Sequence, residues 1–372
     1  MSYIKNIRLN YFRNYETASL NGIERGFIVL TGANGAGKTN LLEAISYVSP
    51  GRGLRNAKAT ELQNGNFSNE MWGVATQVDT EFGEIKIGTG RNPKNDRRLI
   101  KIQGEPVKSQ TALAEYLSCI WVTPQMDGLF RGGASDRRRF IDRLLLTYDP
   151  AHAGRTTRYE NALSQRSKLL KDDTRKADPA WLKALEVQMA ETGIAIAAAR
   201  LAFLERLQKA CLQNKGNSFP LARLSFKGLM ENHLQNKAAL EVEDLFLEEL
   251  ERSRQIDAVT GGASVGPHRT DLDVVYDEKN IGAAQCSTGE QKALLMGLIL
   301  AHARLLLADQ GRAPIMLLDE VAAHLDEERR ATLFSIIRDM KSQVWITGTD
   351  EQIFSSIKNE GQFFVVADGK IA

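Results

Sequence analysis

The sequence predicts an α/β nucleotide-binding fold combined with a second, mainly helical part. The first observation is residues 31–39, which match the phosphate-loop pattern G-x-x-x-x-G-K-[ST] between a strand-like apolar run and a helix-like run. The second is residues 314–320, an apolar run that ends in two carboxylates and is typical of a parallel strand buried on both faces. The third is a change to helical spacing of apolar residues between residues 159 and 214.

The composition is that of an ordinary soluble protein, with 43% hydrophobic and 25% charged residues among 372. A formal net charge of +2 does not by itself indicate nucleic acid, so any basic surface is expected to be local. Cys119, Cys211 and Cys286 lack C-x-x-C spacing, which predicts reduced thiols and neither a disulfide framework nor a zinc site. Because we see neither a signal peptide nor an apolar run of bilayer length, we expect a cytoplasmic protein.

The phosphate loop gives the most specific prediction. Its glycines let backbone N–H groups converge on phosphate oxygens, and the N-terminus of the following helix adds positive potential. Lys38 is expected to reach the β- and γ-phosphates, and the Thr39 hydroxyl to bind Mg²⁺. A glycine-rich surface turn is a much weaker alternative, because both flanks fit. The predicted nucleotide-binding residues of the loop are Gly32, Ala33, Asn34, Gly35, Ala36, Gly37, Lys38, Thr39 and Asn40.

The elements around the loop indicate strands. Residues 3–9 alternate apolar and polar side chains, as in a half-buried strand. Arg13 follows, and it either contacts the nucleotide or is an exposed hairpin arginine; the two interpretations are equally good. Further strands are expected at residues 71–78, 84–88 and 99–102, between turns rich in Gly, Asn and Pro.

Positive charge is concentrated in one stretch. Residues 86–143 contain twelve Lys or Arg and six Asp or Glu. Such a surface would bind a phosphate backbone through counterion release. A solvated helix start, with Asp136 and Asp142 paired to neighbouring arginines, explains the charges equally well. The candidate DNA contacts, taken from this stretch and from the cationic loop at residues 50–55, are Arg52, Arg55, Arg137, Arg138 and Arg139.

The helical part lies between residues 159 and 214, where Gly and Pro become rare. Asp178 followed by Pro179 predicts the start of a helix. We expect a helical hairpin whose apolar stripe packs on itself, with arms of roughly 35 residues that extend about 50 Å. The acidic residues 241–251 are most simply a solvated helix face.

Two carboxylates follow the apolar strand near the C-terminus. Ligands of doubly wound sheets bind at the carboxyl ends of the strands, where these side chains are expected. Asp319 is expected to hold Mg²⁺ through water, and Glu320 to polarise the attacking water. Upstream, Ser287 is a natural helix cap beside exposed N–H groups that form an anion site. His268 and Arg269 either face phosphate or are structural.

Five motifs in this order resemble the ABC-ATPase head of the SMC and Rad50 group. They are the phosphate loop, a Thr-Pro-Gln loop (123–125), a Ser-Thr-Gly-Glu-Gln helix start (287–291), the Asp-Glu strand end (319–320) and a His-Leu-Asp loop (324–326). Asn-Tyr-Phe-Arg-Asn-Tyr (10–15), Arg-Arg-Arg-Phe-Ile-Asp (137–142) and Gly-Pro-His-Arg (266–269) narrow the resemblance to the RecF family of bacterial recombination mediators, over nearly the whole chain.

The resemblance implies a fold and a mechanism. The fold is an α/β ABC-ATPase head of the SMC/Rad50 type with mixed sheets, formed by residues 1–120 and 261–372. Residues 121–260 form an inserted helical domain with a short hairpin arm. The mechanism is an ATP-dependent homodimer in which Ser287 of one protomer caps the γ-phosphate bound to Lys38 of the other. The signature residues acting in trans are Ser287, Gly289 and Glu290.

The resemblance also implies roles for single residues. Gln125 helps hold the metal and the attacking water, Asp326 belongs to the D-loop, and Thr349 stands at the switch position. Cys286, Thr288 and Glu290 depart from the Leu, Gly and Gln of the usual ABC signature, and Thr349 replaces the usual His. These departures favour slow, timer-like ATP hydrolysis.

The implied partners are DNA (duplex, gapped and single-stranded), RecR, and RecO and RecA in the same pathway. The implied role is to help load RecA at single-strand gaps, with ATP and Mg²⁺ as cofactors. The alternative function is an ATPase subunit of a nuclease complex, for which we find no additional acidic or His cluster in the sequence. A transporter subunit is disfavoured because it would be shorter and keep Lys38 and Ser287 much closer together.

Overall fold

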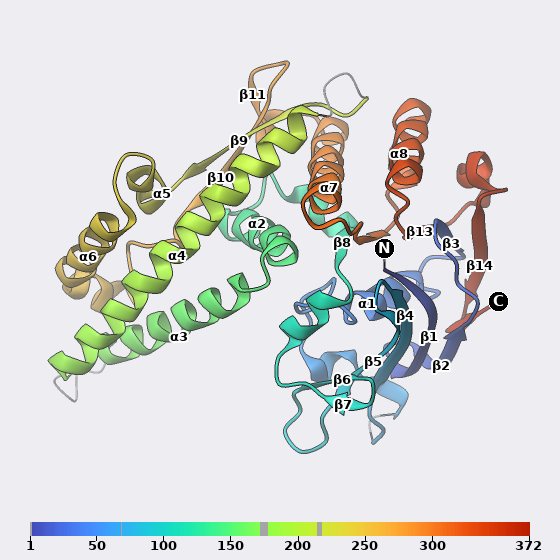
Figure 1. The fold of residues 1–372 in the computed structure, drawn as a ribbon, viewed down its shortest axis with the longest axis horizontal. Coiled ribbons are helices and arrows are strands. Elements are labelled where there is room, and N and C mark those ends of the chain that lie inside the picture. The colour runs from blue at the N-terminus through green and yellow to red at the C-terminus, as the bar shows by residue number, and fades with distance from the viewer. Residues whose placement is uncertain (1, 68, 172–177, 214–217) are drawn as a thin grey trace. The chain divides into compact units, whose positions relative to one another are not determined.

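The computed structural model describes residues 2–67, 69–171, 178–213 and 218–372 (Figure 1). The chain folds into two compact units. Unit 1 comprises Met1–Asp127, Ala210–Leu221 and Ser287–Ala372, and unit 2 comprises Gly128–Lys209 and Ala222–Cys286. Residues 261–286, which we expected in the head, belong to unit 2 because β10 (Asp271–Tyr276) pairs along its length with β9 (Ala222–Lys227).

Unit 1 contains a mainly parallel six-stranded sheet of order β15-β14-β3-β13-β12-β8. Its strands are β3 (Phe27–Thr31), β8 (Cys119–Val122), β12 (Ile315–Leu318), β13 (Val344–Gly348), β14 (Gly361–Ala367) and β15 (Lys370–Ile371). Strands β3, β8, β12 and β13 are buried at every position, which explains their uninterrupted apolar sequences. The predicted buried strand before the two carboxylates is β12.

A second six-stranded sheet of unit 1 is antiparallel, with order β2-β1-β4-β5-β6-β7. Its strands are β1 (Tyr3–Phe12), β2 (Tyr15–Leu20), β4 (Gly73–Thr80), β5 (Gly83–Arg91), β6 (Arg98–Ile102) and β7 (Glu105–Pro106). The alternating sequence therefore predicted β1 correctly, and the strands expected between residues 71 and 102 are β4, β5 and β6.

Helix α1 (Lys38–Ser46) contacts β1 of the antiparallel sheet and β13 of the parallel sheet, so the phosphate-loop helix lies between the two sheets. Helix α7 (Thr288–Gln310) packs against β8 and against α8 (Glu327–Met340) (Figure 1). The ring of Phe27 on β3 meets Phe334 of α8 edge-on at 5.6 Å between centroids. Helix α7 thus packs at the β8 edge of the parallel sheet, and α8 packs against β3 in its interior.

In its described residues, unit 2 combines helices α2 to α6 with the antiparallel sheet β11-β10-β9, in which β11 is Ile281–Gly282. The helices are α2 (Ala134–Tyr148), α3 (His152–Lys171), α4 (Pro179–Leu212), α5 (Leu229–Leu234) and α6 (Ala239–Thr260). Helix α4 begins at Pro179, as predicted, and at 1.5 Å per residue it is about 50 Å long. The turn expected between the two arms falls on residues 172–177, outside the described residues.

The hairpin packs on itself, since Tyr159 and Ala162 of α3 lie in one apolar cluster with residues of α4, but α6 also shares this core, which the sequence did not predict. Helix α3 contacts α6, and Leu185 and Met189 of α4 lie in one cluster with Val242, Phe246 and Leu250. The last three residues are spaced four apart and are 0% exposed. The acidic stretch at 241–251 is therefore one face of an amphipathic helix, and its apolar face belongs to the core.

Helices α4 and α7 are long and apolar enough to cross a membrane by length and composition, which the sequence analysis did not anticipate. Their most apolar windows are 56% and 72% buried inside the protein, as in core helices. Cys119, Cys211 and Cys286 are buried thiols that form no disulfide among the described residues.

Candidate nucleotide-binding site

The phosphate loop joins β3 to α1 and has a backbone conformation that requires its glycines. Gly32, Gly35 and Gly37 have φ values of 145°, 81° and 121°. A Cβ at Gly32 would lie 2.1 Å from the carbonyl oxygen of Val366, so this position also needs glycine for close approach to β14. The middle of the loop is exposed to solvent.

Lys38 is folded back over this loop. Its Nζ donates hydrogen bonds to the carbonyl oxygens of Gly32 at 2.6 Å and Ala33 at 2.9 Å. Burial lowers the pKa of Lys38, while the charges of Glu320 and Asp319 oppose that shift. The ammonium group is thus enclosed by backbone oxygens within reach of two carboxylates.

Residues at the connection between β1 and β2 form hydrogen bonds with the backbone of the phosphate loop. Asn14 Nδ2 donates to the Ala36 carbonyl oxygen at 3.0 Å, and Tyr15 OH donates to the Gly37 carbonyl oxygen at 3.0 Å. Asn40 Nδ2 of α1 donates to Asn14 Oδ1 at 2.7 Å. Asn40 was predicted as a nucleotide-binding residue, whereas Asn14 and Tyr15 were assigned no role, although they immediately follow Arg13 in a motif of the sequence.

Glu43 of α1 is a fully buried carboxylate that binds two arginines. Arg13 forms a bidentate pair with it at 2.8 and 2.9 Å, and Arg55 Nη1 donates to Glu43 Oε2 at 2.8 Å. Arg13 also donates to the Glu61 carbonyl oxygen, and Arg55 to Asn40 Oδ1. Two positive charges on one negative charge leave the cluster with a net charge of +1 beside the phosphate loop, and contact of Arg13 with the nucleotide stays a prediction.

Replacing Glu43 with Gln is expected to destabilise unit 1 by about 2–4 kcal/mol, because both guanidinium groups lose their charged partner in a partly buried site. Urea unfolding, with hydrogen exchange of the α1 amides as a local readout, measures the effect. Glu16→Gln, at an exposed position of β2, is the matched control. Equal unfolding midpoints for the two variants would contradict a structural role for Glu43.

Asp319 lies at the carboxyl end of β12 and faces the phosphate-loop helix. Thr39 Oγ1 donates to its carboxylate at 2.9 Å, and Thr347 Oγ1 of β13 donates to Asp319 Oδ1 at 2.8 Å. Burial raises the pKa of Asp319, and the two hydroxyl hydrogen bonds oppose this shift. The structure therefore joins the two motifs that the sequence placed 280 residues apart.

Thr347 also positions Glu320. The Glu320 N–H donates to Thr347 Oγ1 at 2.8 Å, and Glu320 has a φ of 56°, which L side chains rarely adopt. The Glu320 side chain is half-buried and takes no part in the hydrogen bond between Thr39 and Asp319. Thr347 could not be predicted from the sequence, because a threonine at the end of a buried strand carries no signal by itself.

The residues at this point fit a magnesium ion. The Thr39 hydroxyl and the Asp319 carboxylate are hard oxygen donors in direct contact. Mg²⁺ in nucleotide sites is held by one or two such groups together with substrate phosphates and water. Of the predicted metal ligands, Thr39 and Asp319 are brought together.

Gln125 lies in the 3-10 helix η4 (Pro124–Gly128), directly after β8, and its side chain is exposed. Asp127 of the same turn forms an ion pair with Lys292 of α7 at 2.8 Å. This pair connects the Gln125 turn to the first turns of the signature helix, and it was not found from the sequence.

The signature residues cap α7. Ser287 accepts a hydrogen bond from the Glu290 N–H at 3.4 Å, and its own N–H and hydroxyl donate to Glu290 Oε2 at 2.8 Å. Ser287, Thr288 and Gly289 are exposed, whereas Cys286 is buried. Within the described residues, the hydrogen bonds of Ser287 stay on its own helix and those of the Lys38 side chain stay on its own loop.

The two remaining predicted site residues are Asp326 and Thr349. Asp326 is the N-cap of α8 and accepts from the Arg329 N–H at 2.8 Å. Thr349 directly follows β13 and is exposed. Both are in unit 1, and their proposed contacts with a second protomer stay predictions.

Most of the candidate DNA contacts already have partners. Arg137 forms a bidentate pair with Asp271 at 2.7 and 2.8 Å, and Arg138 donates to a backbone carbonyl before β10 at 2.6 Å. Arg139 is exposed and pairs with Asp136. The alternative interpretation, in which Asp136 and Asp142 pair with neighbouring arginines, is confirmed for Arg139 with Asp136. It is wrong for Asp142, which pairs with Arg200 and His152, and Arg137 binds the distant Asp271.

His268 has a structural role, the second of the two interpretations that the sequence allowed. Its Nε2 donates to the Ala263 carbonyl oxygen at 2.9 Å, so the neutral ring accepts the Tyr159 hydroxyl at Nδ1, at 2.7 Å. Burial lowers the pKa of His268 to about 4, and the Ala263 hydrogen bond opposes the shift. The ring is neutral at pH 7 and adds no positive charge.

The chain matches the family described as RecF/RecN/SMC N terminal domain over residues 3–371. It is 46% identical to the DNA replication and repair protein RecF of Rhizobium etli, across 99% of this chain and 98% of that protein. It is also 46% identical to the protein of the same name from Agrobacterium fabrum, with the same coverage.

Solved structures agree with these relatives. The recombination mediator protein RecF-ATPrS in the RecFOR pathway superposes with a TM-score of 0.86 and 26% identity, covering all of this chain and 97% of that one. An SMC head domain from Pyrococcus furiosus, bound to the C-terminal domain of ScpA, superposes with a TM-score of 0.55 and 17% identity over all of this chain and 96% of that one. The second comparison supports the ABC-ATPase head fold alone.

Proposed function

Because this chain belongs to the RecF family, we propose that it is an ATP-dependent DNA-binding protein of replication and recombinational repair. The observation that carries the proposal is the contact of Thr39 with Asp319, which joins the phosphate loop to the carboxylate strand. RecF structures with ATP and ATPrS that align with the whole chain support ATP as the nucleotide.

ATP would bind with its phosphates in the glycine loop. The Lys38 ammonium would exchange its bonds to the Gly32 and Ala33 carbonyls for phosphate oxygens, which are stronger acceptors because they are charged. Thr39 and Asp319 would hold Mg²⁺, which when bound neutralises charge on the phosphates. Glu320, fixed by its N–H bond to Thr347, would orient and polarise the attacking water, with Gln125 as a second contact.

The nucleotide would be shared between two protomers. Ser287 and Gly289 are exposed at the N-terminus of a 23-residue helix, so its free N–H groups are available to a phosphate on another molecule. ATP would then stabilise only the closed, two-fold dimer, and loss of the γ-phosphate would let it open. Glu290 places a carboxylate beside Ser287, which agrees with slow rather than rapid turnover.

In the cell this switch would act in the cytoplasm on duplex, gapped and single-stranded DNA, and would help load RecA at gaps together with RecO and RecR. Arg55 binds Glu43, and Arg137 binds Asp271 of β10. Of the candidate DNA contacts, Arg52 and Arg139 are exposed and bind neither Glu43 nor β10. They remain candidate phosphate contacts.

Sedimentation with a gapped duplex, in ATP and in ADP, tests the proposed function. We expect a dimer bound to DNA in ATP and a weakly bound monomer in ADP. The logarithm of the DNA affinity should fall linearly with the logarithm of salt concentration, with a slope of about −0.9 for each phosphate contacted. A flat plot, or the same behaviour in both nucleotides, would rule out an ATP-gated grip on the phosphate backbone.

A further inference from the structure

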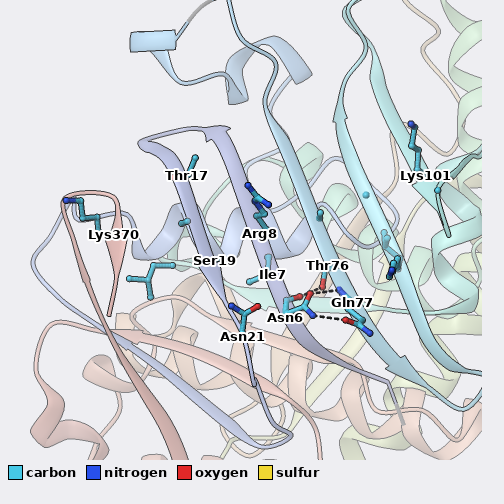
Figure 2. Close-up of a pocket in the computed structure, with 17 residues that line it drawn as sticks. Asn6, Ile7, Arg8, Thr17, Ser19, Asn21, Thr76, Gln77, Lys101 and Lys370 are labelled. Atoms are coloured by element: carbon cyan, nitrogen blue, oxygen red, sulfur yellow. Dashed lines mark hydrogen bonds between the residues drawn. The ribbon is translucent and has the colours of Figure 1, made fainter.

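A hollow of about 970 Å³ lies on the antiparallel sheet of unit 1, and we call it the sheet hollow (Figure 2). It opens on the face opposite to buried side chains such as Leu9, Val74 and Val78, because neighbouring residues of a strand point to opposite faces. The nucleotide site uses none of its lining residues.

Strand register explains why this face is hollow. Ser19, Arg8, Ala75, Gly88 and Lys101 are directly paired from β2 through β1, β4 and β5 to β6. The middle of this row is Ala75 and Gly88, and a Cβ added at Gly88 would meet no atom within 4 Å. Small residues therefore form the floor, with long cationic side chains on either side.

The sheet hollow is lined by four cations and by no carboxylate among the described residues. The cations are Arg8, Lys86, Lys101 and Lys370. Figure 2 shows Arg8 between Lys370, on β15 beside β2, and Lys101 on β6. None of the four has an ion-pair partner in the described part of the chain, in contrast to Arg137, which is paired with Asp271.

This charge arrangement favours a polyanion. Four like charges around one hollow repel one another, and a bound phosphate backbone would relieve that repulsion and release counterions. Glu84, two residues before Lys86 on β5, forms an ion pair with Lys5 and also accepts from Gln77. Asp79, which pairs with Glu84 across β4 and β5, forms an ion pair with Arg25. The local charge is therefore far more positive than the +2 of the whole chain suggests.

The lining also distinguishes among polyanions. Among the described residues it contains no aromatic side chain, so it offers neither a stacking platform for the bases of a single strand nor an aromatic anchor for a protein. Thr17, Ser19, Asn21 and Gln77 supply hydroxyl and amide donors of the kind that bind DNA phosphates. Arg8 and Lys101 are three strand spacings apart, about 14 Å, which is close to the roughly 12 Å width of a major groove.

We propose that the sheet hollow binds the phosphate backbone of double-stranded DNA through Arg8, Lys86, Lys101 and Lys370. The proposal rests on the proposed DNA-binding function and assigns it to a surface that the sequence-derived arginines do not include.

The test compares two sets of substitutions in the full-length protein with ATP and a blunt 30-base-pair duplex. The first variant combines Arg8→Gln, Lys86→Gln, Lys101→Gln and Lys370→Gln. The matched control combines Lys94→Gln and Lys108→Gln, which are exposed cations outside the hollow. Each lost phosphate contact is expected to reduce the salt slope by about 0.9 and the affinity at 0.1 M salt about eightfold. ATP-dependent dimerisation should be unchanged in both.

The outcomes separate this proposal from the proposed function. In one outcome, the four-site variant binds DNA with the affinity and salt slope of the wild type, while the wild type binds DNA only in ATP. This result would contradict DNA binding at the sheet hollow and leave the proposed function unaffected. A flat salt plot for the wild type would overturn both. Poly-glutamate serves as a second probe, standing for an acidic protein partner. If the four-site variant loses poly-glutamate binding but keeps its DNA affinity, the hollow is a protein-docking surface and the proposal is overturned. If the four-site variant does not fold, Lys86→Gln and Lys101→Gln, both exposed, are measured singly against the same expectations.

Discussion

Replacing Glu320 with Gln is expected to slow ATP hydrolysis by about 10²–10⁴-fold while preserving the ATP-dependent dimer. Glutamine has nearly the same shape, and the backbone position of Glu320 is set by its N–H bond to Thr347, which the substitution leaves in place. The lost carboxylate is the group expected to accept a proton from the attacking water, and a general base contributes a factor of this size. Metal binding by Thr39 and Asp319 should persist, because they contact each other independently of Glu320.

Single-turnover release of phosphate measures the chemical step, and sedimentation in ATP measures the dimer. Glu327→Gln, at an exposed position in the first turn of α8, is the control. The closed dimer should outlive that of the wild type, because ATP persists in it. Hydrolysis at the wild-type rate would remove Glu320 from the chemistry, and loss of the dimer would give it a role in assembly.

Replacing Lys38 with Arg is expected to leave a folded monomer that neither dimerises with ATP nor holds duplex DNA stably. The ammonium is a compact charge enclosed by the Gly32 and Ala33 carbonyls, and a planar guanidinium cannot take the same place. The expected loss of nucleotide affinity is at least tenfold, since a charge-assisted bond to phosphate is lost.

Fluorescent ATP-analogue binding and sedimentation check this expectation, with Lys58→Arg, at a position outside the loop, as the control. An unchanged thermal unfolding midpoint without nucleotide shows that the variant is folded. If Lys38→Arg dimerised with ATP and bound duplex normally, nucleotide would not gate the protein.

The phosphate loop and the carboxylate strand could be predicted from sequence because each motif is local. Residues 31–39 carry their own turn glycines, and the run before Asp319 has the continuous apolar sequence of a strand buried on both faces. Their meeting follows from the parallel order of β3, β13 and β12, which aligns the carboxyl ends of these strands at one edge of the sheet.

The supporting residues could not be predicted, because they depend on pairing between distant segments. Thr347 reaches Asp319 only because Leu318 of β12 pairs with Ile346 of β13. Arg13 is held by Glu43, 30 residues later, and a local pattern shows no reason to prefer that acid to a phosphate. Long-range register decided these contacts.

The charge count shows the same limit. The stretch from residue 86 to residue 143 is rich in cations, but Arg137 is paired with Asp271, which lies far along the chain. Lys86 and Lys101 belong to the same stretch and have no ion pair among the described residues. A count locates a basic stretch, whereas the fold decides which of its charges remain available.

Mixing two inactive variants tests the shared nucleotide site most directly. Lys38→Arg removes the phosphate contact and Ser287→Arg blocks the exposed helix start, so each variant alone should stay monomeric in ATP. In a mixture, a heterodimer would contain one intact site, with Lys38 from one chain and Ser287 from the other. We predict that sedimentation of the mixture shows an ATP-dependent dimer that neither variant forms alone. A mixture that stays as monomeric as its components would show that Ser287 does not act on the partner's nucleotide.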